Sequence, residues 1–99
     1  MRKLNGKQNG DLIVSDAVEF HGMIDGNVTL GDGAHWDHHG MVNGDLIVGV
    51  GARAEVHGMI NGTLINLGGE AKVYGTVEAI RDENGAKTVV DAKAHVRTQ

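Results

Sequence analysis

The sequence contains no cysteine and no proline, and it has one phenylalanine, one tyrosine and one tryptophan among its 99 residues. Without cysteine, neither a disulfide framework nor a thiolate zinc site can hold the fold together, so packing and backbone hydrogen bonds must stabilise it. Long apolar runs are missing as well. We therefore expect neither a signal peptide nor a membrane span, we do not expect membrane binding, and we predict a cytoplasmic protein.

Basic residues are missing from a long stretch of the chain. No lysine or arginine lies between Lys7 and Arg53, whereas seven aspartate and glutamate residues do. Nucleic-acid binding relies on lysine and arginine contacts to phosphates, so we predict no nucleic-acid partner for this stretch. The length fits one domain, residues 1–99.

What the chain does contain is glycine, 16 residues in all, much of it in a repeated phrase. The segment EFHGMIDGNV at Glu19–Val28 returns as EVHGMINGTL at Glu55–Leu64, and HHGMVNGDL lies between them. A period this regular indicates a repeat architecture in which each copy packs on the next. The first glycines of the copies follow one another at spacings of 16, 18, 18 and 17 residues: Gly6, Gly22, Gly40, Gly58 and Gly75.

Within a copy, apolar residues alternate with a period of two. From Gly40 to Val56 every even position is apolar or glycine, Val50 included, and the odd positions are mostly polar. Strands alternate in this way, whereas a helix would lose about 1 kcal/mol at each glycine. We therefore predict an all-β fold, a single-stranded β-solenoid of about five turns of 16–18 residues, each turn with three sides.

Two copies depart from this pattern. In the 17-residue copy we interpret the inward phase as moving to Leu67, and in the last copy RDENGAK predicts a charged, hairpin-like inserted loop at residues 81–87. After this loop the apolar alternation resumes. We align its Val90 and Val96 with Val50 and Val56 of the earlier copy.

The recurring phrase V-x-G-x-[IV]-x-G-x-[LV]-x-[VL], with alanines and glycines between, resembles the bactofilins, the polymer-forming cytoskeletal family of bacteria. The resemblance spans residues 4–96. It implies a right-handed β-helix that joins further copies of itself end to end into filaments, without a nucleotide. It also implies a structural, self-assembling scaffold rather than an enzyme.

Association through the ends of a solenoid uses unpaired strand edges. We expect the association surface to include Leu4 and Leu12 at one end and Val90 and Val96 at the other. Charges near both ends leave an alternative open, because charged residues and loops can also block strand edges. In that alternative the solenoid is capped, forms only a dimer and acts as a protein-binding module.

Two outward ladders follow from the repeat. Stacked imidazoles are potential ligands for a divalent metal, but repetition alone also explains such a ladder, and we predict neither a metal nor another cofactor. The neighbouring methionines, with Ile47 and Ile65, form an apolar stripe suited to docking a partner. The histidine ladder is His21, His39 and His57, and the methionine ladder is Met23, Met41 and Met59.

The segment GAHWDHHG replaces the alanine-rich side found in other copies and puts Trp36 and His38 on the inward phase. We expect Trp36 to fill the bore and its indole N–H to need a partner. His38 is either a core histidine with both ring nitrogens satisfied or the sign of an outward bulge. A catalytic pair with Asp37 is not expected, because adjacent strand residues point to opposite faces.

A solenoid with turns of about 18 residues is also similar to the hexapeptide-repeat acyltransferases, which place an aliphatic residue at every sixth position. The copies here centre instead on two glycines four residues apart. The sequence also offers no long loop to build a cofactor cleft. We therefore rank an acyltransferase below a structural role.

Overall fold

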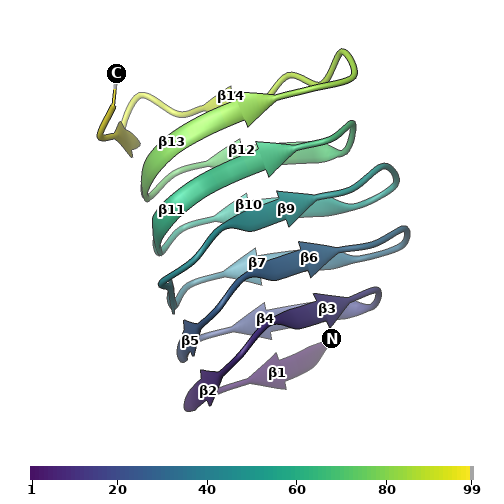
Figure 1. The fold of residues 1–99 in the computed structure, drawn as a ribbon, viewed down its shortest axis with the longest axis vertical. Coiled ribbons are helices and arrows are strands. Elements are labelled where there is room, and N and C mark those ends of the chain that lie inside the picture. The colour runs from purple at the N-terminus through teal and green to yellow at the C-terminus, as the bar shows by residue number, and fades with distance from the viewer. Residues whose placement is uncertain (99) are drawn as a thin grey trace.

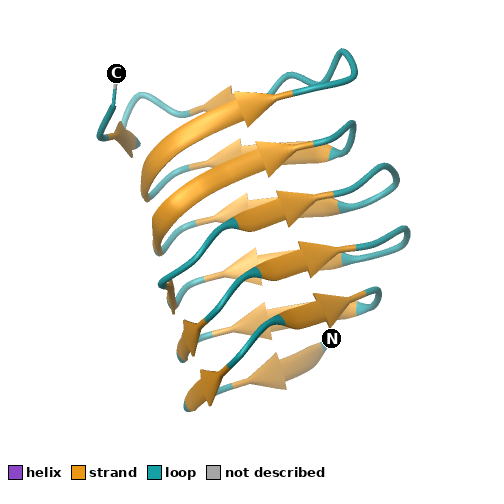
Figure 2. Cartoon of the chain, viewed as in Figure 1, coloured by secondary structure: helices purple, strands orange, loops and turns teal. Residues whose placement is uncertain are grey.

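The structure is a computed structural model that describes residues 1–98. These residues form fifteen strands joined by turns and contain no helix, and hence none that could cross a membrane (Figure 2). In Figure 1 the chain runs from left to right along the near strands, returns along the far strands, and climbs from the N-terminus to the C-terminus. This is the sense of a right-handed helix. The predicted all-β, right-handed solenoid is confirmed, with five turns and part of a sixth.

Each turn has three sides, and the strands of one side stack into a face. All strand pairs are parallel, because every turn repeats the path of the one before it. The first face contains, in stacking order, β1 (Arg2–Leu4), β4 (Ala17–Phe20), β7 (His35–His38), β10 (Arg53–Val56), β12 (Glu70–Val73) and β14 (Val89–Val90).

The second and third faces are joined in the upper turns by two long strands, β11 (Met59–Asn66) and β13 (Thr76–Asp82). Val42 and Ile60 are direct partners on neighbouring turns, as the repeat predicts. Below β11 the second face contains β2 (Lys7–Asn9), β5 (Met23–Asp25) and β8 (Met41–Val42), and above β13 it contains β15 (His95–Val96). The third face contains β3 (Leu12–Val14), β6 (Val28–Leu30) and β9 (Leu46–Val48).

The recurring glycines mark places where successive turns touch. A Cβ atom on Gly22 would overlap the carbonyl oxygen of Gly6 one turn below, and the same holds for Gly40 above Gly22 and Gly58 above Gly40. Neither a side chain nor a shift of the carbonyl is tolerated there, since that oxygen accepts the next turn's N–H: Met23 N–H donates to Gly6 O at 2.8 Å. Glycine is therefore required by contact between consecutive turns.

The turn between the third and first faces departs from strict alternation. Val50 is 69 % exposed rather than inward, because the chain bends between Gly49 and Ala52. In the 17-residue copy the missing residue falls in this same turn. Consequently Asn66, the partner of Val48, keeps the inward phase and is fully buried, while Leu67 is only half-buried. The prediction that Leu67 takes the inward phase is wrong.

The last copy also differs from its predicted alignment. Strand β13 continues through Asp82, so the charged loop begins at Glu83 rather than at 81. Its turn has positive φ at Asn84 (57°) and Gly85 (77°), which is the geometry favoured by an Asn-Gly pair. Beyond the loop, Val90 pairs with Val73 and Val96 with Val77. The alignment with Val50 and Val56 is therefore wrong, and so is the prediction that the charged loop is an insertion. Residues 83–88 span the same corner as residues 49–54, which puts Val90 in the place of Val56. The extra residues lie instead between Val90 and Val96, which takes the place of Ile60.

Candidate functional site

Both ends of the solenoid present strand edges. Among the described residues β1, β2 and β3 each pair on one side only, with β4, β5 and β6. At the opposite end β14 pairs only with β12 and β15 only with β13, again counting residues 1–98. The outer backbone groups of these strands have no ladder partner from another strand of this part of the chain. Both ends are thus templates for strand pairing.

The four residues predicted for end association belong to three inward columns that run the height of the solenoid. Leu4 begins and Val90 ends one column, through Phe20, His38, Val56 and Val73. Leu12 begins a second column, which ends at Ile80. Val96 ends the third column, which begins at Gln8. Two of the three columns therefore have an apolar residue at both ends.

Exposure of these end residues follows their position in the stack. Leu4 and Leu12 are half-buried against the core, Val90 is 40 % exposed and Val96 is 9 % exposed. Val89, which points outward beside Val90, is 54 % exposed. Both ends therefore leave aliphatic surface that a further turn would cover, with Val96 contributing the least.

The methionines form the predicted ladder on the second face. Met23, Met41 and Met59 are register partners and all are half-buried. Arg97 covers the upper end of this ladder, with its Nη2 at 3.6 Å from the sulfur of Met59. The stripe is thus shorter than the repeat alone suggests.

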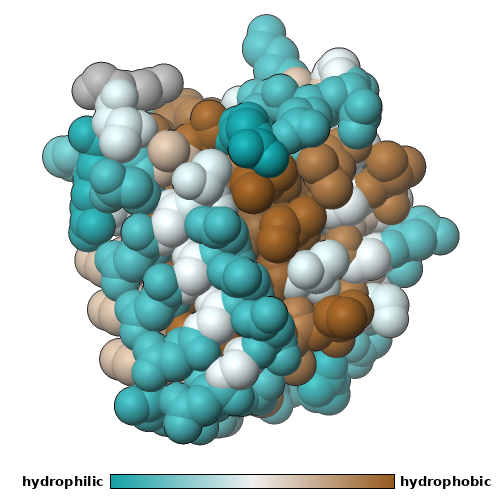
Figure 3. Space-filling model, in the orientation of Figure 1, coloured by the Kyte–Doolittle hydropathy of each residue, from teal (hydrophilic) through white to brown (hydrophobic). Residues whose placement is uncertain are grey.

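A separate apolar patch lies on the third face, where brown side chains gather over β3, β6 and β9 (Figure 3). Its outward column contains Ile13, Thr29, Ile47 and Ile65, which are partners from turn to turn. Ile13 is 78 % exposed, and Ile47 and Ile65 are half-buried. The methionine ladder and the isoleucine column lie on different faces, so they do not form the single stripe predicted from the sequence.

The predicted histidine ladder is present on the side of the solenoid. The ring centroids of His21 and His39 lie 4.9 Å apart and those of His39 and His57 lie 4.8 Å apart, with nearly parallel planes. Tyr74 continues the stack at 4.8 Å from His57. The three histidines do not share one partner, however. His21 donates from Nε2 to Glu19 Oε2 at 3.0 Å, and this hydrogen bond lowers the pKa of Glu19.

The other two histidines of the ladder face Asp37. Its Oδ1 lies 3.0 Å from Nε2 of His39 and 3.9 Å from Nε2 of His57. The side chain of Asp37 is 23 % exposed, that of His39 38 % and that of His57 40 %. All three therefore lie at the surface, and Asp37 is the most enclosed. The repeat predicts that His39 and His57 stack. It does not predict that Asp37 contacts both of them, because Asp37 was considered only as a partner of His38.

Inside the third turn, Trp36 and His38 form a closed polar pair in the core. Both are fully buried, and Trp36 Nε1–H donates to His38 Nδ1 at 2.9 Å. Nε2 of His38 faces the carbonyl oxygens of Gly40 and Met59 at 3.0 and 3.1 Å. Since indole only donates, His38 accepts at Nδ1 and donates from Nε2. The predicted core histidine with both nitrogens satisfied is confirmed, and no outward bulge occurs.

Burial also fixes the charge of His38. Loss of hydration lowers its pKa to about 4, and an added proton at Nδ1 would point at the indole N–H. His38 is therefore neutral near pH 7. It has no path to act on a molecule outside, and Asp37 points to the opposite face, as predicted.

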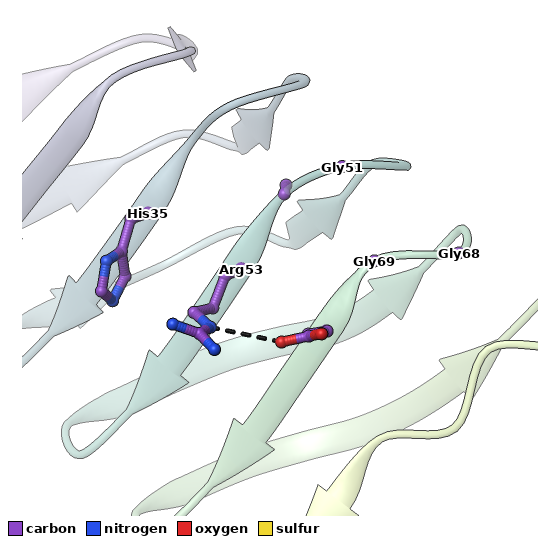
Figure 4. Close-up of a pocket in the computed structure, with 7 residues that line it drawn as sticks. His35, Gly51, Arg53, Gly68 and Gly69 are labelled. Carbon is purple, nitrogen blue, oxygen red and sulfur yellow. Dashed lines mark hydrogen bonds and ion pairs between the residues drawn. The ribbon is translucent and has the colours of Figure 1, made fainter.

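A shallow hollow of about 440 Å³ lies beside the first face, where Gly51, Gly68 and Gly69 leave the corner without side chains (Figure 4). His35 and Arg53 extend along its edge from neighbouring strands. Arg53 is already paired with Glu70 at 3.2 Å. The hollow therefore offers no uncompensated cation to hold an anionic ligand.

Polar ladders also connect the turns. One begins with Lys7 near Asp25, and continues as Asn43 donates to Asp25, Asn61 donates to Asn43 at 2.7 Å, and Arg97 donates to Asn61 at 3.3 Å. In another, the residue after the second glycine accepts from the backbone of the next turn: Asp11, Asn27 and Asp45 from the N–H groups of Asn27, Asp45 and Thr63. The sequence signal for these ladders is the recurring Asp or Asn at those positions.

Comparisons of this chain with protein-family models, with curated proteins and with solved structures find no match.

Proposed function

We propose that this protein is a non-enzymatic structural scaffold whose solenoids associate head to tail, as the resemblance to the bactofilins implies. The observation that carries the proposal is the match between the two ends. If the C-terminal end of one copy meets the N-terminal end of the next, β14 pairs with β1 and Val90 lies against Leu4, which continues one inward column. On the third face Ile80 belongs to the fifth turn, so a space of one strand separates it from Leu12 of the next copy.

Head-to-tail contact also suits the strand direction. Every strand pair within the chain is parallel, and joining unlike ends keeps the added pairs parallel. Such a contact is heterologous, since two different surfaces meet, and it leaves one end of each kind exposed for a further copy. Growth then continues into a filament.

The third column makes the contact between copies less apolar, because Val96 would meet the polar side chain of Gln8. The basic side chains of Arg2, Lys3 and Lys7 surround the N-terminal end, but two of them have partners. Arg2 pairs with Asp16 at 2.9 Å and Lys7 with Asp25 at 3.5 Å. These pairs reduce the repulsion that an approaching end would meet.

Sedimentation velocity over a range of concentrations, with electron microscopy of the same samples, tests the proposal. The wild-type chain is expected to form filaments, and Leu4→Lys or Val90→Lys is expected to return it to monomer. Met41→Lys is the matched control, because it adds the same charge on the side and should leave the filaments intact. Filaments lost with Met41→Lys would instead indicate lateral docking, and a discrete dimer would indicate the capped protein-binding module.

A further inference from the structure

The outer surface of the first face carries three carboxylates in one column. Glu19, Asp37 and Glu55 are direct partners on β4, β7 and β10, so they stack on successive turns. Like charges placed opposite one another on neighbouring strands are destabilising. Within residues 1–98 the ion-pair partners of these three carboxylates are all histidines. The column thus lacks a permanent positive charge at bonding distance.

The central carboxylate has the richest set of neighbours. Asp37 shares one oxygen between the Nε2 atoms of His39 and His57, and the three ligand atoms all lie within 4.8 Å of one another. His39 follows Asp37 by two residues and therefore points to the same side of the sheet. His57 stacks on His39 from the next turn. Asp37 lies in β7, and His39 and His57 directly follow β7 and β10. Backbone hydrogen bonds from His39 N–H to Phe20 O and from His57 N–H to His38 O hold both histidines in the register between turns.

We propose that Asp37, His39 and His57 bind a divalent transition-metal ion, with Zn²⁺ the best match. Zinc bonds imidazole nitrogen and carboxylate oxygen at about 2.0–2.2 Å, which places tetrahedral ligand atoms about 3.3 Å apart. The distances from Asp37 Oδ1, 3.0 and 3.9 Å, bracket that value. The planes of His39 and His57 are nearly parallel, so both exposed rings must turn towards Asp37 to direct their Nε2 lone pairs at one ion.

The donor set selects the class of ion. Two imidazoles and one carboxylate suit zinc and its transition-metal neighbours, whereas Ca²⁺ and Mg²⁺ take oxygen ligands. Three protein ligands leave a fourth tetrahedral position open to water, or to a group from another molecule. The site lies on the middle turns of the side, so it depends neither on the ends nor on the proposed assembly.

The neighbouring histidine supplies a matched control. His21 belongs to the same stack as His39, but its Nε2 is hydrogen-bonded to Glu19. If any pair of stacked imidazoles binds the metal ion, His21 and His57 should contribute equally to the metal affinity. If the ion binds at Asp37, His39 and His57, then of these two residues only His57 should contribute to the metal affinity.

Calorimetric titration of the untagged full-length chain with ZnCl₂, in a buffer that does not bind zinc, tests the proposal. The wild type is expected to bind one ion per chain, and Co²⁺ is expected to give the intense visible absorption of a four-coordinate site. Asp37→Asn and His57→Gln should each weaken binding at least tenfold, and His21→Gln should change it less than twofold. Thermal melts followed by circular dichroism check that each variant is folded.

The absence of saturable binding up to roughly 100 μM Zn²⁺, a weak affinity for a three-ligand site, would overturn the proposal. An equal loss with His21→Gln and His57→Gln would overturn it as well, since it would assign binding to the ladder as a whole. If Asp37→Asn fails to fold, the comparison of the two exposed histidine variants decides alone. Binding that sediments only with aggregated protein also counts against the site.

Discussion

The third and fourth turns of the solenoid pair in register on the first face, but their interiors are filled differently. The third contains Trp36 and His38 where the fourth contains Ala54 and Val56. Despite this difference in volume, Gly40 and the corresponding glycine of the fourth turn each meet the glycine one turn below. The path of the backbone is therefore fixed by the close contacts and the hydrogen bonds between turns, and not by the size of the enclosed side chains.

The difference also shows how neighbouring layers compensate. Trp36 stacks on Phe20 of the second turn with ring centroids 5.1 Å apart, and His38 meets the same ring edge-on at 5.2 Å. Above them the alanine of the fourth turn takes up little space. The large side chains of the first face thus lie together in the second and third turns, and the smaller Ala54 and Ala71 follow above them.

The largest effect should come from making the third turn resemble the fourth. Trp36→Ala removes a fully buried aromatic side chain and leaves Nδ1 of His38 without a donor. We expect a loss of about 3–5 kcal/mol in the free energy of unfolding, measured by urea denaturation. Trp36→Phe keeps most of the volume but not the N–H, so it should cost clearly less. Equal losses would show that the hydrogen bond, rather than the volume, dominates.

A somewhat smaller effect is expected from pH, because the third turn buries the titratable His38 where the fourth turn has Val56. The pKa of His38 is about 4 in the folded chain and 6.5 as the ordinary value, so the unfolded chain binds the extra proton between these pH values. Stability should therefore be intact above pH 6.5 and fall as the pH drops towards 4, by roughly 3 kcal/mol in total.

His38→Gln is the control for this pH effect, because glutamine keeps one acceptor and one donor but does not titrate in this range. Carboxylates such as Asp16, whose pKa its hydrogen bond with Arg2 lowers, act mainly below pH 4 and are common to both proteins. The difference between the two urea-denaturation curves should shrink from pH 7 to pH 4. A constant difference would contradict the account.

A smaller loss is expected from enlarging the fourth turn. Ala54→Leu adds volume directly above Trp36, and overpacking of this kind costs about 1–3 kcal/mol. Combining it with Trp36→Ala should recover part of both losses, because the added leucine can fill the space that the indole leaves. Additive losses in the double variant, measured by the same denaturation, would show that the two layers are packed independently.

The smallest effect should come from the exposed amide ladder. Asn43→Ala in the third turn removes the hydrogen bonds to Asp25 and from Asn61, and should cost about 0.5–1 kcal/mol because both lie at the surface. Asn61→Ala in the fourth turn also removes the contact with Arg97, and should cost slightly more. Thermal melts of the two variants side by side measure the difference.

The sequence was sufficient to predict the solenoid because a strict period and a two-residue alternation act together. The register of the first glycines and the inward positions of Trp36 and His38 could all be predicted from it. Where the length of a copy changes, the prediction fails. One residue fewer in a turn can be absorbed before or after a strand, and only the buried hydrogen bonds of Asn66 with Gly68, Gly69 and Thr88 show which occurs.

The candidate metal cluster was only partly predictable for a similar reason. Repetition indicated that His39 and His57 stack, but the choice of Asp37 as their common neighbour depends on side-chain length and rotamer. In the second turn, glutamate replaces aspartate and binds only its own histidine. No periodicity argument distinguishes these two outcomes.

The absence of cysteine allows a direct test of head-to-tail association. Lys3 and Val89 begin and end one outward column, so a Lys3→Cys, Val89→Cys double variant should place the two thiols of joined copies about 5 Å apart between their Cα atoms, within disulfide range. Mild oxidation of this variant should give a ladder of covalent oligomers in non-reducing gels, and a mixture of the two single variants should give heterodimers. Dimers formed by Lys3→Cys alone, with no ladder from the double variant, would contradict the account.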